Sequence, residues 1–369
     1  MMRWPEMGWI ALSDQNRQVF DLNGIGAARG TAAETLDPSS LLTCGSILFE
    51  MRLPGDGRPR KLLGYHRDHP WVSSFSLQEL PTGGVALVIT QGQDVFHTVL
   101  EHDAVTQAEE LRVTYSWDAP ARWGRLAIER IRSGKVFQKV LRDPKPLLLT
   151  DLRVMTLDPL QRQMDRAVQF FAISTEVEPI GPMPGLTAQV PILTAQGYRA
   201  AQSLRRGDLV RTPDGQLVPV LQVIKRDVPA LGSFAPVRLR APYFGLQQDI
   251  LVGAEQRLWS SGSAVEYLFG KPQVRIPAAH LINGVSAMKH QPQDTVSYWQ
   301  ILLPGNEPCV AAGSTLETLF LGRNRRDKAL MAASLLSHVD RSRLPEHITP
   351  GFPLLDHFEA ITLAELRAA

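Results

Sequence analysis

The side chains that most readily do covalent or metal chemistry are few in this sequence and lie far apart. The two cysteines, Cys44 and Cys309, provide neither a metal-ligand spacing nor a disulfide framework. His338, His347 and His357, near the C-terminal end, do not have the spacing of metal ligands either. We therefore predict two buried thiols that behave as small apolar residues, with no metal site and no cofactor.

A more informative pattern begins at Gly185 and runs to Thr212, with the letters GLTAQVPILTAQGYRAAQSLRRGDLVRT. A short strand ends at Thr194, a turn follows at Gly197, and the run L-R-R-G-D at residues 204–208 precedes a second strand. This order resembles the opening of a Hint (hedgehog/intein) domain, a module that rearranges its own backbone. The resemblance implies an all-β fold and, in active relatives, cleavage of the peptide bond that precedes the first residue of the domain.

Self-cleavage in this family begins when a cysteine thiolate attacks the carbonyl of the preceding residue. Gly185 stands at the position of that cysteine and has no side-chain nucleophile. Thr187 carries a nearby hydroxyl, but it lies two residues along the chain and addresses the wrong peptide bond. This sequence therefore has no nucleophile at the position where the first step of the family's reaction needs one.

The family's second requirement is a histidine in a Thr/Ser-x-x-His pattern, which polarises the scissile amide. The matching segment, 249–258, has Gly253 at the Thr/Ser position and Gln256 at the histidine position. Gln300 lies on a later strand where relatives often carry another histidine. Glutamine forms hydrogen bonds but does not titrate near neutral pH as histidine does. The resemblance thus implies a degenerate site with no catalytic residue.

Further segments follow in the family's usual order, and the resemblance covers roughly residues 183–325. They are residues 236–245, 266–270, 274–284, 296–303 and 317–322. The pattern is similar to that of a bacterial Hint subfamily found in alphaproteobacteria. We assign a Hint-like domain to residues 185–325.

The N-terminal part of the chain shows a different pattern, a series of short strands. Residues 46–53 form one of them, with alternating apolar positions on one face. Further strands are predicted at 71–78, 84–90, 95–100, 110–117 and 124–130. Strands at this spacing favour an antiparallel β-sandwich, which we assign to residues 41–172. Their order is similar to that of concanavalin-like and laminin-G-like jelly rolls.

Aromatic and carboxylate side chains in this sandwich raise the question of sugar binding. Trp71, Trp117 and Asp118 are the candidates, because an aromatic platform beside oriented polar groups suits carbohydrate. The sequence favours the other interpretation, in which the tryptophans pack in the core because strand aromatics usually face it, and Asp118 caps backbone amides in the turn after it.

The remaining segments are connectors and ends. Residues 1–40 are predicted to be weakly ordered, and residues 173–184 a Pro-rich, semi-rigid linker. Apolar residues at 160, 164, 167 and 171 recur at helical spacing and predict a helix within residues 157–171. A helical C-terminal tail is assigned to residues 326–369.

Charge and hydropathy exclude several classes of partner. The chain of 369 residues has 39 Lys and Arg against 37 Asp and Glu, a formal net charge of +2, so nucleic acid and membrane are not expected partners. A basic cluster at 323–328 could meet an acidic partner or simply begin a solvated helix. No apolar run approaches the roughly 20 residues of a membrane helix, and the start lacks the features of a signal peptide. We expect cytoplasmic synthesis, with signal-less export or assembly into a particle as further possibilities.

The sequence therefore predicts a mainly β protein of two domains, an antiparallel sandwich followed by a Hint-type domain with short C-terminal helices. The favoured function is that of a non-catalytic structural or binding module with an unknown protein or glycan partner. One alternative is autoprocessing at the Pro184–Gly185 bond by an unusual route. Another is glycan binding by the sandwich.

Overall fold

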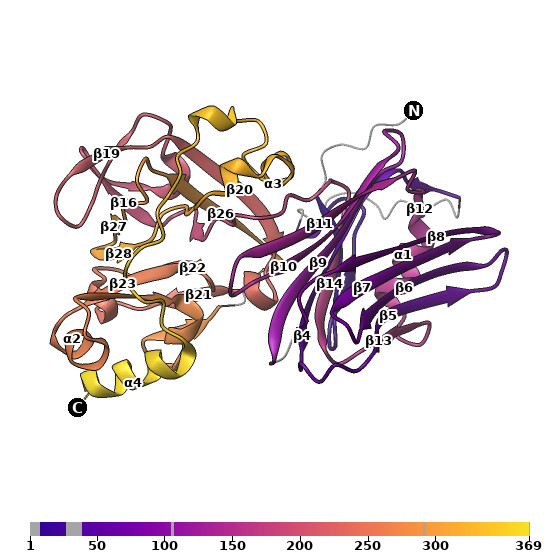
Figure 1. Ribbon diagram of the computed structural model, residues 1–369, viewed down its shortest axis with the longest axis horizontal. Helices are drawn as coiled ribbons and strands as arrows, with labels where there is room; N and C mark the ends of the chain where they lie inside the picture. Colours follow the sequence, from indigo (N-terminus) through magenta and orange to yellow (C-terminus); the bar gives the residue numbers. More distant parts are fainter. Residues whose placement is uncertain (1–7, 27–38, 105–106, 291–292, 369) are drawn as a thin grey trace. The chain divides into compact units, whose positions relative to one another are not determined.

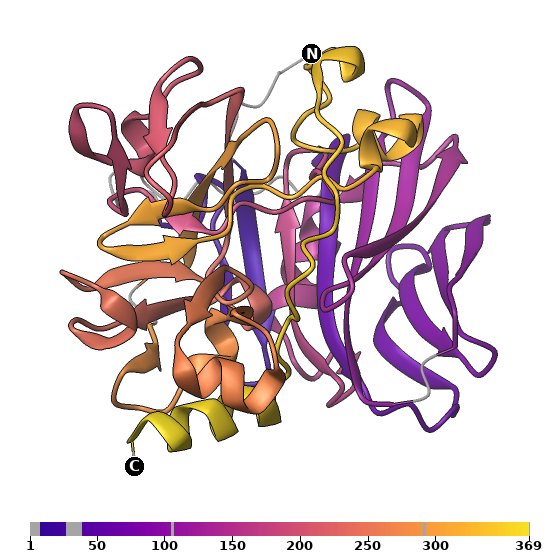
Figure 2. The same ribbon diagram turned by 60° about the vertical axis from the view of Figure 1, so that its left-hand side comes forward.

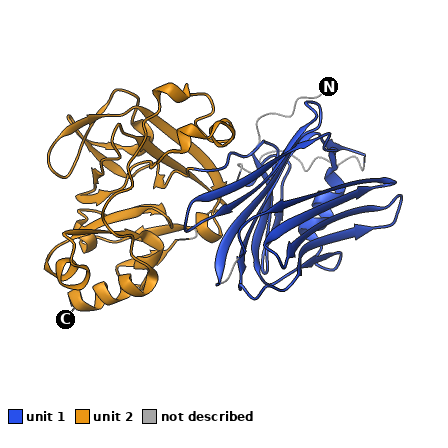
Figure 3. Ribbon diagram, viewed as in Figure 1, with its two compact units in different colours: residues 1–181 blue, residues 182–369 orange. Residues whose placement is uncertain are grey.

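A computed structural model describes residues 8–26, 39–104, 107–290 and 293–368. The chain forms two compact units, residues 1–181 and residues 182–369 (Figure 3). Both units are built from antiparallel sheets with short helices. The predicted fold class, mainly β with an N-terminal sandwich, is confirmed.

The first unit contains two large antiparallel sheets (Figure 1). The seven-stranded sheet has the order β11 (Lys135–Arg142), β10 (Trp123–Arg130), β9 (Glu109–Asp118), β4 (Cys44–Leu53), β14 (Val168–Ser174), β1 (Trp9–Asp14) and β2 (Gln18–Phe20). The five-stranded sheet has the order β13 (Arg162–Met164), β5 (Arg60–Arg67), β6 (Ser73–Leu80), β7 (Gly84–Gln91) and β8 (Asp94–Glu101). A small pair, β3 (Leu41–Leu42) and β12 (Leu147–Leu148), precedes helix α1 (Leu149–Leu157).

Alternation along the strands explains why these sheets pack face to face. In β4 the odd-numbered apolar residues from 47 to 53 are all buried, as are those of β9 from 111 to 117. They share one core with residues of β6 and β7 in the other sheet, including Phe75 and Leu87. Burying a side chain of this size contributes about 1.5–3 kcal/mol. The six predicted strands are present, with ends shifted by two residues at most.

The prediction of a weakly ordered N-terminal segment is wrong for residues 9–20. Strand β1 pairs with β14, and Trp9 lies opposite Ser174. Ile10 and Leu12 are fully buried. β1 therefore pairs both with the neighbouring β2, as a local hairpin, and with a strand more than 150 residues away in the sequence. Residues 1–7 and 27–38 of the predicted segment lie outside the described residues.

The helix predicted within residues 157–171 is also wrong. Helix α1 ends at Leu157, and the residues after it form β13 and β14. β13 pairs with β5, and β14 pairs with both β4 and β1. Sheet pairing therefore overrides the helical spacing of the apolar residues in this segment.

The Pro-rich segment 173–184 is not a free spacer over most of its length. Ile173 and Ser174 belong to β14, and Ile180 is buried in the first unit. The Ser46 hydroxyl donates to the carbonyl oxygen of Glu176 at 2.7 Å and accepts from the amide of Glu178 at 2.8 Å. These bonds fasten the segment to the sandwich, and the division between the units falls only after residue 181.

The second unit is also built from two antiparallel sheets. The first has the order β20 (Gln222–Pro229), β26 (Thr295–Leu302), β15 (Leu186–Thr187), β22 (Ile250–Gly253), β21 (Pro236–Leu239) and β25 (Ala287–Lys289). The second has the order β19 (Leu217–Pro219), β18 (Leu209–Arg211), β16 (Pro191–Thr194), β27 (Cys309–Ala311), β28 (Ser314–Leu316), β23 (Arg257–Ser261) and β24 (Gln273–Pro277), with β17 (Gly197–Ala200) paired to β16. Helix α2 (Ser263–Phe269) connects β23 to β24.

The segment predicted as a helical tail contains two short helices separated by non-helical residues, and it is an integral part of the second unit rather than a separate tail. Its helices are α3 (Lys328–Ala332) and α4 (His357–Ala368), and α4 lies beside α2 in both views of the ribbon (Figures 1 and 2). Between them an extended stretch pairs with β24, where Arg275 and Leu354 form a bridge. Leu355 and Leu363 belong to the core of the unit, so this segment helps to hold the fold.

A buried histidine in this segment makes the stability of the second unit depend on pH. The Nδ1 atom of His347 accepts from the amide of Leu321 at 3.2 Å, and Nε2 lies 3.0 Å from the carbonyl oxygen of Leu303. Nε2 therefore carries the proton and donates to that carbonyl. Burial lowers the pKa of His347 below its ordinary value of 6.5.

Because the folded chain binds this proton less readily than the unfolded chain, the contribution of His347 to stability is complete above about pH 6.5 and is lost as the pH falls. We expect the free energy of unfolding of the second unit to fall between pH 7.5 and pH 5, and His347→Gln to weaken that dependence. Hydrogen exchange of peptides from residues 182–368 measures the stability of the second unit alone. The first unit is left out because it contains His102, whose pKa is also lowered by burial. An unchanged pH dependence in the variant would contradict this assignment.

Candidate functional site

The structure brings together Gly185, Gly253, Gln256 and Gln300, the four positions singled out in the sequence. β15 lies between β22 and β26, so the residue just before it, Gly185, meets the end of β22 on one side. The amide of Gly253 donates to the carbonyl oxygen of Gly185 at 2.7 Å. On the other side Leu186 pairs with Trp299, a register that brings Gly185 toward Gln300. The four positions were singled out from their order in the sequence, and in the structure they lie close to one another.

The side-chain amides of Gln256 and Gln300 form the centre of the site. Both residues are buried. Nε2 of Gln300 donates to Oε1 of Gln256 at 2.9 Å, and Nε2 of Gln256 donates to the carbonyl oxygen of Glu317 at 2.9 Å. Oε1 of Gln300 accepts from the amide of Ile301 at 3.2 Å. The two glutamines are therefore joined to each other and to the backbone by neutral hydrogen bonds, which is the usual state of buried amides.

The space beside the Cα atom of Gly185 is limited by the Gln256 side chain. Its φ lies outside the left-handed region, so the backbone conformation alone does not require glycine there. A Cβ atom at this position would lie 2.6 Å from Oε1 of Gln256. The Gln256 amide thus occupies the place where any side chain at residue 185 would begin. At Gly253, by contrast, a Cβ would lie 3.4 Å from the Cα of Gly185, an ordinary contact.

Hydroxyl groups close to this cluster are already engaged. The Thr187 hydroxyl donates to the carbonyl oxygen of Leu251 at 2.7 Å. The Tyr298 ring lies beside Gly253, and its hydroxyl donates to the carbonyl oxygen of Phe234 at 2.8 Å. Burial raises the pKa of Tyr298, so this phenol keeps its proton. Neither group is a poised nucleophile or base in this arrangement.

A buried ion-pair network lies behind the two glutamines, and sequence reasoning missed it. The Glu317 carboxylate accepts from Nη1 of Arg275 at 2.9 Å and from Nη1 of Arg257 at 3.1 Å. Nη2 of Arg275 also donates to the carbonyl oxygen of Phe352 at 3.2 Å. Charged residues within otherwise apolar strand segments were the available signal, because buried charges are almost always paired. The network links three separate parts of the second unit.

The candidates for sugar binding are not brought together. Trp117 is fully buried, its Nε1 donates to the carbonyl oxygen of Leu42 at 3.0 Å, and its ring stacks on Tyr115. Trp117 therefore packs in the core, as the favoured interpretation expected, and it is not available as a platform for a ligand. Asp118 accepts from the amide of Ala121 at 3.1 Å, as the turn-capping alternative proposed. Trp71 is 45% exposed, beside the Arg67 guanidinium, and precedes a strand of the other sheet.

The structure also describes the two cysteines and the basic cluster, and it bears on metal binding and on membrane-spanning helices. Burial raises the pKa of Cys309 to about 12 and also raises that of Cys44. Arg325 and Arg326 both pair with the Glu346 carboxylate, so part of the basic cluster is engaged within the chain. The described residues hold no group of three or more His, Cys, Asp or Glu side chains that could bind a metal. Within the same residues, no helix is long and apolar enough to span a bilayer.

Comparison with known proteins gives a family match and several solved structures. The Hint domain family matches residues 184–323. An intein-like domain from the bacterium Clostridium thermocellum is 15% identical over 37% of this chain and 99% of that chain, with a TM-score of 0.29. The MchDnaB-1 intein is 13% identical over 36% of this chain and 98% of that chain, with a TM-score of 0.25. The CBM40 of the Ruminococcus gnavus IT-sialidase is 16% identical over 36% of this chain and 63% of that chain, with a TM-score of 0.24. No curated protein matches the chain.

Proposed function

We propose that this protein, in which residues 184–323 form a Hint domain, has lost self-cleavage and serves as a non-catalytic structural or binding module. One observation carries the proposal. The side-chain amide of Gln256 lies where a side chain at residue 185 would begin, with Oε1 2.6 Å from the Cβ position. The group closest to the place that a nucleophile would need is therefore a neutral, hydrogen-bonded amide, which would have to move for a side chain at residue 185.

The other groups of the cluster do not replace the missing chemistry. Acyl transfer needs a nucleophile and a group that exchanges a proton with the leaving nitrogen. Gln256 does not titrate near neutral pH, and both ends of its amide are already hydrogen-bonded. Thr187 directs its hydroxyl at the carbonyl oxygen of Leu251. These contacts support a site that stabilises the fold.

A role in structure or binding agrees with how the cluster is built. The two glutamine side chains bond to each other and to Glu317, whose carboxylate in turn holds Arg257 and Arg275. A buried polar network whose members satisfy one another rigidifies a core. A rigid, uncleaved unit suits a protein that remains whole in an assembly, such as a surface or particle component, where it would meet a protein or glycan partner.

Autoprocessing at the Pro184–Gly185 bond by an unusual route is the competing function. It differs from the proposal in one outcome, the integrity of the chain. Glycan binding by a surface that includes both Trp71 and Trp117 loses its support, because Trp117 is buried. Trp71 alone remains an exposed aromatic candidate.

A variant that restores only the nucleophile distinguishes the non-catalytic module from autoprocessing at the Pro184–Gly185 bond. Gly185→Cys supplies a thiol but leaves Gln256 in place, so we expect this variant, like the natural chain, to stay whole in the presence of hydroxylamine. Gly185→Cys combined with Gln256→His is the matched comparison, because it also supplies a group that titrates. Cleavage of Gly185→Cys alone would show that the remaining residues still activate the amide, against the proposal. Circular dichroism and a cooperative thermal transition check that each variant is folded.

A further inference from the structure

A cavity of about 600 Å³ lies in the second unit, lined by residues of helix α4, of the strands β23, β24 and β28, and of the loop 243–245. Its volume falls within the ~300–1,000 Å³ of typical small-molecule sites. Gly185, Gly253, Gln256 and Gln300 do not line it. A ligand here would therefore bind apart from the Hint-type cluster.

The apolar part of the lining is already in place in the fold. On α4 the lining residues are Ala360, Leu363, Ala364 and Arg367, a spacing that places them on one face of the helix. Ala360 and Leu363 are each 2% exposed, and Leu258 of β23 is 3% exposed. Ala364 is small and exposed, so the helix does not fill the space beside it.

Three aromatic residues also line the cavity. Trp259 meets the ring of Phe352 edge to face with centroids 5.4 Å apart, a contact that fixes its orientation. Phe244 has a φ of +59°, in the left-handed region that bulky residues rarely adopt. Strained residues of this kind cluster at ligand sites. Tyr243 is 45% exposed, so an apolar molecule in the cavity can reach its ring.

Arg367 is the one charged side chain among the described residues that line this cavity. Its Nη2 atom donates to the carbonyl oxygen of Ser261 at 2.7 Å, which holds the guanidinium at the cavity. No carboxylate of the described residues pairs with it. A guanidinium has five N–H donors, and because Arg367 is exposed, a ligand can reach those that remain. This cation therefore favours a negatively charged group.

The polar groups of the lining are few, and one of them is unpaired. Ser314, at the start of β28, is 5% exposed, and its hydroxyl bonds to no other described residue. Nδ2 of Asn283 donates to the Ser286 hydroxyl at 2.9 Å, so these two side chains are oriented by each other. An apolar lining with a small number of placed polar groups is the usual composition of a ligand site.

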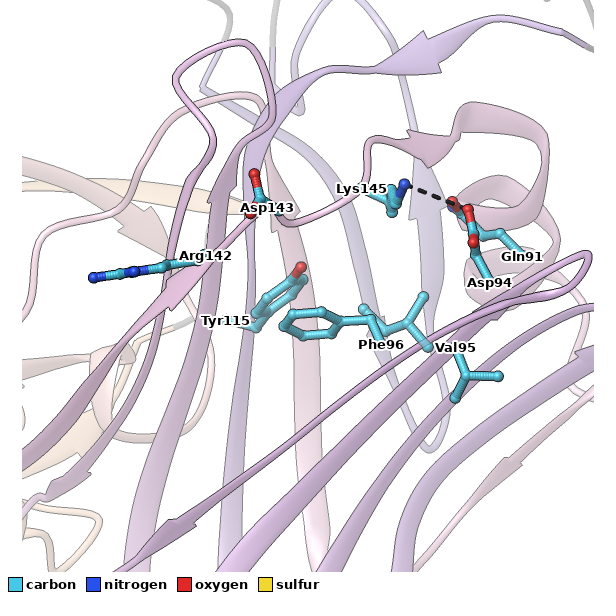
Figure 4. Close-up of a pocket in the computed structure, with 9 residues that line it drawn as sticks. Gln91, Asp94, Val95, Phe96, Tyr115, Arg142, Asp143 and Lys145 are labelled. Atoms are coloured by element: carbon cyan, nitrogen blue, oxygen red, sulfur yellow. Dashed lines mark ion pairs between the residues drawn. The ribbon is translucent and has the colours of Figure 1, made fainter.

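A smaller cavity in the first unit, of about 240 Å³, differs in its charges (Figure 4). Lys145 and Asp94 both line it and pair with each other at 3.3 Å. Asp143 pairs with Arg122, and the Arg142 side chain points away from the other lining side chains (Figure 4). That cavity therefore presents no unpaired charge to a ligand, unlike the cavity beside α4.

We propose that the cavity beside α4 binds an amphipathic carboxylate, a small molecule with an apolar body and one negative charge. The body would pack on Tyr243, Phe244 and Trp259, and the carboxylate would accept from the guanidinium of Arg367. Burial of the apolar body provides affinity. The charge-assisted pair provides selectivity against neutral molecules of the same shape.

Calorimetric titration of the full-length protein with octanoate and 2-naphthoate, and with the neutral counterparts 1-octanol and 2-naphthol, tests the proposal. We expect each carboxylate to bind about tenfold more tightly than its alcohol. Arg367→Gln should remove most of this preference and leave the affinity for the alcohols unchanged. Arg211→Gln is the matched control, because Arg211 also donates to a backbone carbonyl, that of Gly215, but does not line the cavity. It should change neither affinity.

Ala364→Trp is the second variant, because an indole at this exposed position of α4 would occupy the cavity. We expect it to abolish the binding of carboxylates and alcohols alike, with the thermal transition of each variant as the folding check. Three results would overturn the proposal: no binding of either carboxylate at millimolar concentration, alcohols that bind as tightly as the carboxylates, or binding that survives in folded Ala364→Trp. None of them bears on the loss of self-cleavage, which is tested separately.

Discussion

Replacing Glu317 by alanine should lower the free energy of unfolding of the second unit by about 3–5 kcal/mol. The carboxylate is buried and pairs with Arg275 at 2.9 Å and with Arg257 at 3.1 Å. The Arg275 side chain is only 8% exposed. Removing the carboxylate therefore leaves a buried guanidinium without its counter-charge, which costs far more than the loss of an exposed pair. The backbone carbonyl of Glu317, which accepts from Gln256, is kept in the variant.

Native-state hydrogen exchange of peptides from residues 182–368 measures this effect without interference from the sandwich. Arg238→Ala is the matched control, because Arg238 pairs with Asp249 on the surface with side chains 46% and 35% exposed. Exposed pairs contribute about 0–1 kcal/mol. If Glu317→Ala cost no more than Arg238→Ala, the network would have no structural importance. Faster exchange around residues 352–355 in Glu317→Ala would also show that Arg275 holds the C-terminal segment, as its bond to Phe352 indicates.

Gly185→Ala should destabilise the second unit by about 1–3 kcal/mol. The new methyl group would lie 2.6 Å from Oε1 of Gln256. The amide must then move, and its bonds to Gln300 and Glu317 weaken in a buried site where water does not replace them. This effect depends on space alone, since the φ of Gly185 lies outside the left-handed region.

A double-mutant cycle with Gln256→Ala tests that cause. Truncating Gln256 removes the atom that the new methyl group would meet, so the double variant should be less destabilised than the sum of the two single variants. Additive losses would contradict the steric explanation. Gly253→Ala is the matched control, because a Cβ there makes only ordinary contacts, the nearest at 3.4 Å. It should cause no loss of stability.

The positions of this cluster could be located from the sequence because the segments that carry them follow one another in a recognisable order along the chain. Gly185, Gly253, Gln256 and Gln300 were identified by position, and strand pairing then brings them together. The sequence could not show that the Gln256 amide fills the space beside Gly185. That arrangement depends on side-chain conformation in a packed core, which local patterns do not determine.

Long-range pairing explains the errors in the first unit. Strand β1 forms a hairpin with β2, a local feature that the sequence could have indicated, and it also pairs with β14, more than 150 residues away, which the sequence could not show. The strand of residues 109–118 did contain a usable signal. Its apolar positions alternate from Leu111 through Val113 and Tyr115 to Trp117, and that alternation predicts that Trp117 faces the core. The burial of Trp117 agrees with the interpretation that the strand aromatics of this domain face its core.

Intact-mass spectrometry of the freshly purified natural chain, before and after incubation with a thiol and with hydroxylamine, tests most directly the proposal that self-cleavage is lost. We predict a single species at the full 40.9 kDa in every condition, because neither Gly185 nor Gln256 supplies the chemistry of the first step. Two fragments that meet at the Pro184–Gly185 bond would contradict the account and show that another group of the chain acts as the nucleophile.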